Sequence, residues 1–186
     1  KADPDGVDFI IVCVSWGLAD ERALTDAQKQ WAQIFADAGV DVVLGTHAHL
    51  PQTLTYVQGK DGGKTLVAYG LGNFLGPVRS GGKDAGLILN FTLTKDFDAG
   101  TKAIEEVSYT PTWVLKYSSE GKYAFEIMSS VEYSTKRYQN MSQADRNRVK
   151  AVQKEIEQAL GAGAGKVDTN IREMKDGVSA IVEQES

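Results

Sequence analysis

The sequence is poor in the side chains on which many enzymes depend. It contains one cysteine, Cys13, and two histidines, His47 and His49, among 186 residues. A single cysteine excludes an internal disulfide, and its place within an apolar run predicts a small core residue rather than a nucleophile. The net charge is −5 and the basic residues are scattered, which argues against nucleic-acid binding.

Long hydrophobic runs are also lacking. No apolar stretch approaches the roughly 20 residues that a membrane-spanning helix needs. The hydrophobic content of 42% is nevertheless enough for one sizeable core in a globular protein. Because the sequence starts at Lys1 and not at Met, we expect it to be part of a longer protein, with any export signal or membrane anchor outside it.

The first 50 residues predict a β-α-β unit. Residues 8–14 are apolar throughout, as expected of a parallel strand that is covered by helices on both faces. Thr25 and Gln28 have the spacing of a capping box, and Gly39 is a suitable end for the helix that follows. Residues 40–44 then predict a second buried strand. On the helix, we expect the buried face to carry Trp31, Ile34, Phe35 and Ala38.

The rest of the chain predicts antiparallel strands and then a helix. The strands are expected at residues 52–58, 64–69, 86–94, 102–116 and 123–128. Between them, the segment 79–84 is expected to be mobile. Ser142 begins a helix with an apolar stripe and a solvated polar face, and the helix ends at Gly161. We therefore expect a main domain over residues 1–130 and a helical extension over 131–186, with a Gly/Ala linker at 161–165.

The two histidines are the strongest chemical signal. In extended backbone, side chains two residues apart leave the same face, so His47 and His49 can converge on one point. Ligand residues in open α/β sheets gather beyond the carboxyl ends of strands, where Ser15, Trp16 and Gly17 also lie. Neutral imidazole is the commonest metal ligand, so the pair predicts a divalent-metal site. On spacing alone, two turn histidines with only local hydrogen bonds are the alternative interpretation.

Four ordered motifs together resemble one protein family. They are Ser15-Trp16-Gly17 after a strand, Asp37-Ala38-Gly39-Val40-Asp41 at the end of the helix, Gly45-Thr46-His47-Ala48-His49, and Gly70-Leu71-Gly72-Asn73-Phe74. The CapA family of capsule and poly-gamma-glutamate synthesis proteins, also called PGA_cap, shows similar motifs in the same order. The resemblance covers roughly residues 8–128. It implies that residues 1–130 are the C-terminal half of a metallophosphoesterase-like (calcineurin-like) four-layer α/β/β/α sandwich with mixed sheets, followed by a C-terminal helix.

The chain departs from the family at two positions. Where the family has His-Trp-Gly-x-Glu, this chain has Ser15 and Ala19 in place of the histidine and the glutamate. A serine hydroxyl does not replace imidazole toward a transition metal, and alanine cannot transfer a proton. Asp20 and Glu21 follow directly, but a shift of one residue on extended chain points a side chain the other way. We therefore do not expect either of them to restore the lost group.

The resemblance implies a pocket with His47 and His49 as metal ligands, lined by Ser15, Trp16, Gly17 and Asn73. Trp16 is expected to pack beside the pocket or to form an aromatic wall for a ligand, and Asn73 either to line the pocket or to cap a turn. The remaining family ligands, from an Asp-bearing strand and an Asn-Asn-His segment, would precede Lys1. No residue of this chain is assigned as catalytic.

Two hypotheses for the function follow from the resemblance. In the first, the protein assists the biosynthesis, transport or anchoring of poly-gamma-glutamate or a similar capsule polymer, and its metal pocket has decayed. In the second, it is a metal-dependent phosphoesterase or amidase with Mn, Zn, Fe or Mg in a two-metal site that is completed by residues N-terminal to this chain. Both imply a cell-surface protein, anchored outside this chain, whose partner is the capsule polymer or its membrane synthesis complex.

Overall fold

The computed structural model describes residues 6–133, 135–161, 166–167 and 179–181. The helices are α1 (Asp26–Asp37), α2 (Lys136–Gln139) and α3 (Gln143–Leu160), with a short 3-10 turn at Ser80–Gly82. The strands are β1 (Ile11–Ser15), β2 (Val42–Thr46), β3 (Leu54–Gln58), β4 (Lys64–Ala68), β5 (Ala85–Asp96), β6 (Thr101–Ser119), β7 (Lys122–Ser129), β8 (Lys166–Val167) and β9 (Ser179–Ile181). Within these ranges, no helix is long and apolar enough to cross a membrane.

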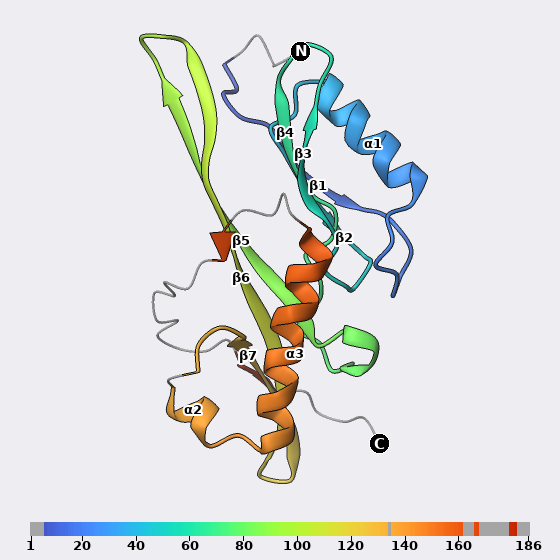
Figure 1. Cartoon of the computed structure of the whole chain (residues 1–186), viewed down its shortest axis with the longest axis vertical. Helices are drawn as coiled ribbons and strands as arrows, with labels where there is room; N and C mark the ends of the chain where they lie inside the picture. Colours follow the sequence, from blue (N-terminus) through green and yellow to red (C-terminus); the bar gives the residue numbers. More distant parts are fainter. Residues whose placement is uncertain (1–5, 134, 162–165, 168–178, 182–186) are drawn as a thin grey trace.

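The first sheet has the strand order β1-β2-β4-β3 and carries α1 on one face (Figure 1). Strands β1, β2 and β4 are parallel, and β3 pairs with β4 as an antiparallel hairpin. Successive side chains of a strand point to opposite faces, so Val43 and Val67 face α1 while Val42 and Leu66 face the second sheet. The predicted β-α-β unit and the hairpin after it are confirmed.

Helix α1 begins and ends as predicted but presents a different face to the sheet. Thr25 forms the capping box with Gln28, and Gly39 has a φ of 82° just beyond the C-cap. The residues buried against the sheet are Gln28, Ala32 and Ala36, whereas Trp31 and Ile34 are about half exposed. The predicted face was therefore wrong for Trp31, Ile34 and Ala38, whereas Phe35 packs against the core as predicted. Alanines spaced four apart let the helix approach the strands closely, so the larger side chains are turned outward.

Strand β1 is also less covered than predicted. Val12 and Val14 pack in the core beneath α1, but Ile11, Cys13 and Ser15 point to the opposite face and are exposed. In the sheet order, β1 is the edge strand, and the described elements cover only one of its faces. The prediction that Cys13 is a core residue was thus wrong.

The second sheet is built on two long strands, β5 and β6, which form a hairpin arm that extends well past β7 (Figure 1). Its order is β5-β6-β7-β9, and β8 pairs in parallel with β6. The apolar stripe of α3 packs on this sheet and shares one core with the inner face of the first sheet. The stripe consists of Val149, Val152, Ile156 and Leu160. Two mixed sheets with packed helices confirm the predicted α/β sandwich class and the C-terminal helix.

Segment 79–84, for which mobility was predicted, makes specific contacts with other parts of the protein. It contains the 3-10 turn and leads into Asp84, whose side chain is only 2% exposed and is held by Arg148 of α3. The polar face of α3 is therefore not simply solvated, because it supplies the partner of a buried carboxylate. Of the predicted linker 161–165, only Gly161 lies within the described residues, and most of the tail beyond it lies outside them.

Candidate functional site

The candidate site lies where the loops after β1 and β2 meet at the carboxyl edge of the first sheet. Ser15 and Thr46 are paired at the ends of these two parallel strands. The backbone N–H of Asp20 donates to the carbonyl of Ala48 at 3.0 Å, which ties the first loop to the histidine loop. The topology thus brings together segments that are nearly 30 residues apart in the sequence.

The two histidines do not continue strand β2. His47 and His49 have φ values of 86° and 60°, in the left-handed region that non-glycine residues rarely adopt. Their ring centroids are nevertheless 5.9 Å apart at an interplanar angle of 54°, so the imidazoles are neighbours. The rings are thus neighbours, but the backbone is not extended as the prediction assumed, and of the two only His49 lines the cavity described below. Strained backbone of this kind is concentrated at functional sites.

Asp20 connects His49 to a lysine from a distant part of the chain. Its Oδ1 lies 3.0 Å from His49 Nδ1, and its Oδ2 accepts a hydrogen bond from Lys83 Nζ at 2.5 Å. The hydrogen bond from Lys83, followed by that from His49, holds the pKa of Asp20 below its ordinary value. At neutral pH, Asp20 is therefore an ionised carboxylate between an ammonium group and an imidazole.

The sequence argument against Asp20 failed because it assumed extended backbone. Asp20 has a φ of 65°, so it lies in a turn and the alternation of strand side chains does not apply. Lys83 was missed altogether. It follows a glycine-rich segment that seemed mobile, and no pattern in the sequence relates it to residues 63 positions earlier.

A cavity of about 270 Å³ opens beside this cluster. It is lined by Asp20, His49, Asn73, Gly76, Pro77, Val78 and Lys83. Asn73 both lines the cavity and fixes its rim, because its Nδ2 donates to the carbonyl of Lys83 at 3.1 Å. Asn73 thus lines the cavity, as one of the two interpretations predicted, and its side chain bonds to a residue ten positions away and not to its own turn.

Ser15, Trp16 and Gly17, which were expected in the pocket, do not line this cavity. Ser15 is on the exposed face of β1. Trp16 is 9% exposed and turned into the core, where its indole N–H donates to the carbonyl of Tyr69 at 2.8 Å and its ring stacks on Tyr69 at 5.4 Å. Trp16 is therefore a packing residue beneath the histidine loop, the first of the two roles considered for it.

Gly45, just before the histidines, has no room for a side chain. A Cβ built there would lie 2.0 Å from the carbonyl oxygen of Tyr69 and 2.4 Å from Trp16 Nε1. The end of β2 thus lies directly against the Trp16 indole and the backbone of Tyr69. This close packing fixes the strand end from which the strained histidine loop departs.

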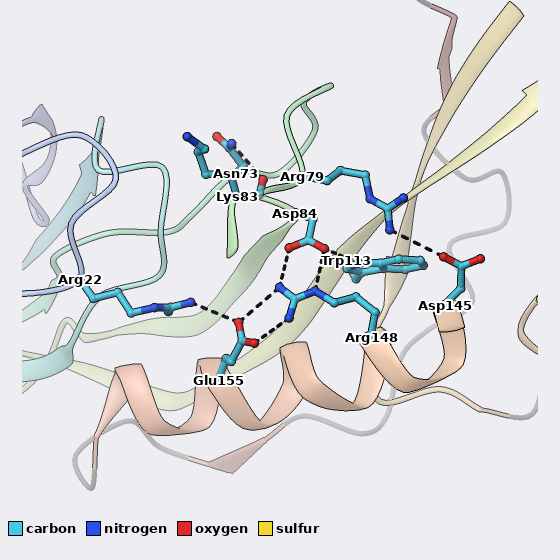
Figure 2. A network of polar contacts seen from close by, with 9 residues as sticks. All are labelled: Arg22, Asn73, Arg79, Lys83, Asp84, Trp113, Asp145, Arg148 and Glu155. Atoms are coloured by element: carbon cyan, nitrogen blue, oxygen red, sulfur yellow. Dashed lines mark hydrogen bonds and ion pairs between the residues drawn. The ribbon is translucent and has the colours of Figure 1, made fainter. Parts of the chain in front are cut away.

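A second polar cluster anchors the loop that carries Lys83 (Figure 2). Arg148 donates to Asp84 from Nε at 2.9 Å and from Nη2 at 2.7 Å, and Trp113 Nε1 donates to the same carboxylate at 2.8 Å. Arg148 also pairs with Glu155, which pairs in turn with Arg22 at 3.3 Å. We call these residues the Asp84 network: Arg22, Asp84, Trp113, Arg148 and Glu155.

Burial alone would raise the pKa of Asp84, but the hydrogen bonds from Arg148 and Trp113 outweigh it and hold the pKa below its ordinary value. Asp84 is therefore ionised and fully paired in the interior. The network joins four segments: the loop after β1, the residue before β5, strand β6, and α3. It was missed in the sequence because the partners of Asp84, and the pair of Arg22 with Glu155, are far apart in the chain.

The donor set of the pocket is a poor fit to a metal site. A protein metal site normally provides three or four His, Cys, Asp or Glu ligands. Within the described part of the chain, no group of three or more such residues is placed to hold a metal ion. His47 and His49 are neighbours, but the nearest carboxylate, Asp20, is already paired with Lys83. The described residues therefore do not form the predicted divalent-metal site by themselves.

Comparison with known proteins identifies the first part of the chain. Residues 1–77 match the family described as bacterial capsule synthesis protein PGA_cap. This region is similar to the PGA_cap family. It contains β1 to β4, both histidines and Asn73, and it ends before Lys83 and the Asp84 carboxylate. The PGA_cap region thus supplies only part of the pocket, and its remaining wall comes from the sequence that follows.

Two curated proteins are similar to the chain over a short stretch. The PGA biosynthesis protein CapA of Bacillus subtilis (strain 168) is 32% identical over 68 residues, which is 37% of this chain and 17% of that protein. The capsule biosynthesis protein CapA of Bacillus anthracis is 32% identical over 69 residues, which is 37% of this chain and 15% of that protein. The chain therefore matches less than a fifth of either relative. No solved structure gave a significant match.

Proposed function

We propose that this chain is part of a CapA-like protein that assists the biosynthesis, transport or anchoring of a capsule polymer, and that its pocket binds without catalysing a reaction. The observation that supports binding without catalysis is the ion pair between Asp20 and Lys83. Within the described residues, Asp20 is the carboxylate that contacts His49, and its pairing with Lys83 argues against a role as metal ligand or general base. The similarity to the two CapA proteins supports the first part.

Poly-gamma-glutamate or a similar anionic polymer is the proposed partner, together with the membrane complex that makes it. The name of the Bacillus subtilis relative refers to PGA biosynthesis, and that of the Bacillus anthracis relative refers to capsule biosynthesis. We place the protein at the cell surface on the same basis. The role can be tested in a capsulated host that lacks its own copy of the gene: the protein carrying this chain should restore surface polymer, and no restoration would reject the capsule role.

A metal-dependent hydrolase is the second candidate, and one contact favours it. A carboxylate hydrogen-bonded to one ring nitrogen of a histidine is the usual way to orient the other nitrogen toward a metal ion. Asp20 is placed in this way on Nδ1 of His49, and the His47 ring is adjacent. Further ligands would then have to come from outside the described residues.

Phosphodiesterase activity separates the two candidates. The longer protein should be compared with its His47→Ala/His49→Ala variant on a general phosphodiester substrate, with thermal unfolding as the control for folding. We expect equal background rates in both, because no described residue activates a nucleophile. Turnover by the wild type that is lost in the double variant would establish the hydrolase and reject a purely binding pocket.

A further inference from the structure

Lys83 is the most unusual member of the pocket. A lysine side chain on a surface loop is normally solvated, and its ion pairs contribute little. The side chain of Lys83 is only 21% exposed, and its ammonium lies 2.5 Å from Asp20 Oδ2. This places a positive charge directly on the one carboxylate that contacts His49.

Contacts of Lys83 itself and of the residues on either side of it fix its position. Its own carbonyl accepts a hydrogen bond from Asn73, and the next residue, Asp84, is anchored in the core by Arg148 and Trp113 (Figure 2). Before it, Gly82 has a φ of 85°, and a Cβ there would lie 2.9 Å from Arg22 Nη2. The loop is thus fixed by contacts that direct Lys83 toward the pocket while Asp84 points inward.

Both oxygens of Asp20 are already engaged. Oδ1 faces Nδ1 of His49, and Oδ2 accepts the hydrogen bond from Lys83. A divalent ion that used this carboxylate would have to displace the ammonium group or share the carboxylate with it. Two cations within a few ångströms repel each other strongly, and a partly buried pair is screened less than an exposed one.

We infer that the Lys83 ammonium is the resident cation of this pocket and keeps a divalent metal ion away from Asp20 and His49. The lysine provides the charge that a metal would otherwise bring to the carboxylate, and it requires no further ligands. This inference goes beyond the proposed binding role and rests on it, because a pocket occupied by its own lysine is suited to binding without metal chemistry.

The inference is tested by titrating Zn²⁺ into the full chain and into three variants, with heat of binding as the readout. Lys83→Met removes the charge but keeps an unbranched side chain, and Lys83→Arg keeps the charge. Lys29→Met is the matched control, because Lys29 pairs with Asp26 on the exposed surface of α1. We expect Lys83→Met to bind Zn²⁺ about 10- to 100-fold more tightly than the wild type. Lys83→Arg and Lys29→Met should stay within about twofold of the wild type.

A fourth variant tests whether the gain in Zn²⁺ affinity depends on the Asp20 carboxylate. In Lys83→Met/Asp20→Asn, the gain in Zn²⁺ affinity should disappear, because the released carboxylate is no longer there. Affinity of Lys83→Met within about twofold of the wild type, or a gain that survives Asp20→Asn, would overturn the inference. Thermal unfolding of each variant shows that it is folded. The capsule assay is a separate readout, so a failure of the proposed function does not alter the Zn²⁺ result.

Discussion

Lys83 and Asp84 are adjacent in the sequence, yet they belong to two very different polar clusters. Lys83 points into the pocket and pairs with Asp20, whose side chain is half exposed. Asp84 points into the interior, where it is 2% exposed and accepts three hydrogen bonds. The first cluster is partly solvated, strained and open to a ligand, whereas the second is buried and fully paired. One loop thus combines a site for binding with the anchor that holds that site in place.

Because of this difference, mutations in the two clusters should affect different properties: stability in one and ligand binding in the other. Substitution of Asp84 should lower the free energy of unfolding, because the Trp113 and Arg148 donors would lose their buried acceptor. Substitutions in the histidine pocket should change ligand binding and leave the free energy of unfolding almost unchanged. Strain at His47 and His49 even predicts that some pocket variants are more stable than the wild type.

The largest effect is expected for Asp84→Ala. Removing this carboxylate leaves the buried Trp113 indole N–H and the Nε of Arg148 without their acceptor, although Arg148 keeps its pair with Glu155. Loss of one partner from such a buried pair lowers the free energy of unfolding by about 3 to 5 kcal/mol. Urea denaturation followed by circular dichroism measures the change.

Glu126→Ala is the matched control for Asp84→Ala. Glu126 also accepts two hydrogen bonds from one arginine, Arg137, but its side chain is 23% exposed. The loss should therefore be about 1 kcal/mol or less. If both variants lose the same stability, burial of Asp84 is not what makes its network important.

The next largest effect is expected for Gly45→Ala. The added methyl group would overlap the carbonyl of Tyr69 and the indole of Trp16, so the strand or the rings must shift. Overpacking of this kind lowers the free energy of unfolding by about 1 to 3 kcal/mol. Gly63→Ala is the control, since a Cβ there has no neighbour within 4 Å and its backbone lies outside the left-handed region. Equal stability of the two variants would contradict the close packing beneath the histidine loop.

A smaller effect of opposite sign is expected for His47→Gly. Left-handed backbone costs a non-glycine residue about 1 to 2 kcal/mol, and the greater backbone freedom of glycine in the unfolded state offsets about 0.5 to 1 kcal/mol of that. The variant should therefore gain about 0.5 kcal/mol in the free energy of unfolding. Thr55→Gly in strand β3 should lose stability in the same assay. Destabilisation by His47→Gly would mean that its imidazole makes contacts that outweigh the strain.

A pH dependence is expected from the same Asp84 carboxylate. Its pKa is lower in the folded state than in the unfolded state, so the unfolded chain binds the proton first as the pH falls. The stabilisation is fully present above about pH 4 and is lost as the pH falls through the folded pKa. Acid unfolding of wild type and Asp84→Asn should show a steeper loss in the wild type. Parallel curves would show that Asp84 titrates normally.

The sequence predicted the features of the fold that local signals determine. Three features were predicted correctly: the capping box of Thr25 and Gln28, the left-handed Gly39, and the apolar stripe of α3. Each of them depends on residues that are close together in the sequence. It did not predict the buried face of α1 or the exposure of Cys13. Those depend on how closely alanines let a helix approach the sheet, and on which strand lies at its edge.

The site was predicted only in part, because only some of its residues belong to local sequence motifs. His47, His49 and Asn73 carried recognisable motifs, and the structure places their loops together. Asp20 and Lys83 became visible only with the backbone geometry, because one depends on a left-handed turn and the other on a contact across 63 residues. Arg148 likewise lies 64 positions from its partner Asp84, on the polar face of α3, which was expected to be solvated.

The central claim, that Lys83 takes the place of a metal ion beside His49, is tested most directly by metal content. The longer protein and its His47→Ala/His49→Ala variant should be purified without chelators and compared by elemental analysis. We predict the same content of Mn, Zn and Fe per chain in both, because neither histidine holds a metal ion in the wild type. Loss of one or more equivalents of metal in the double variant would contradict the account.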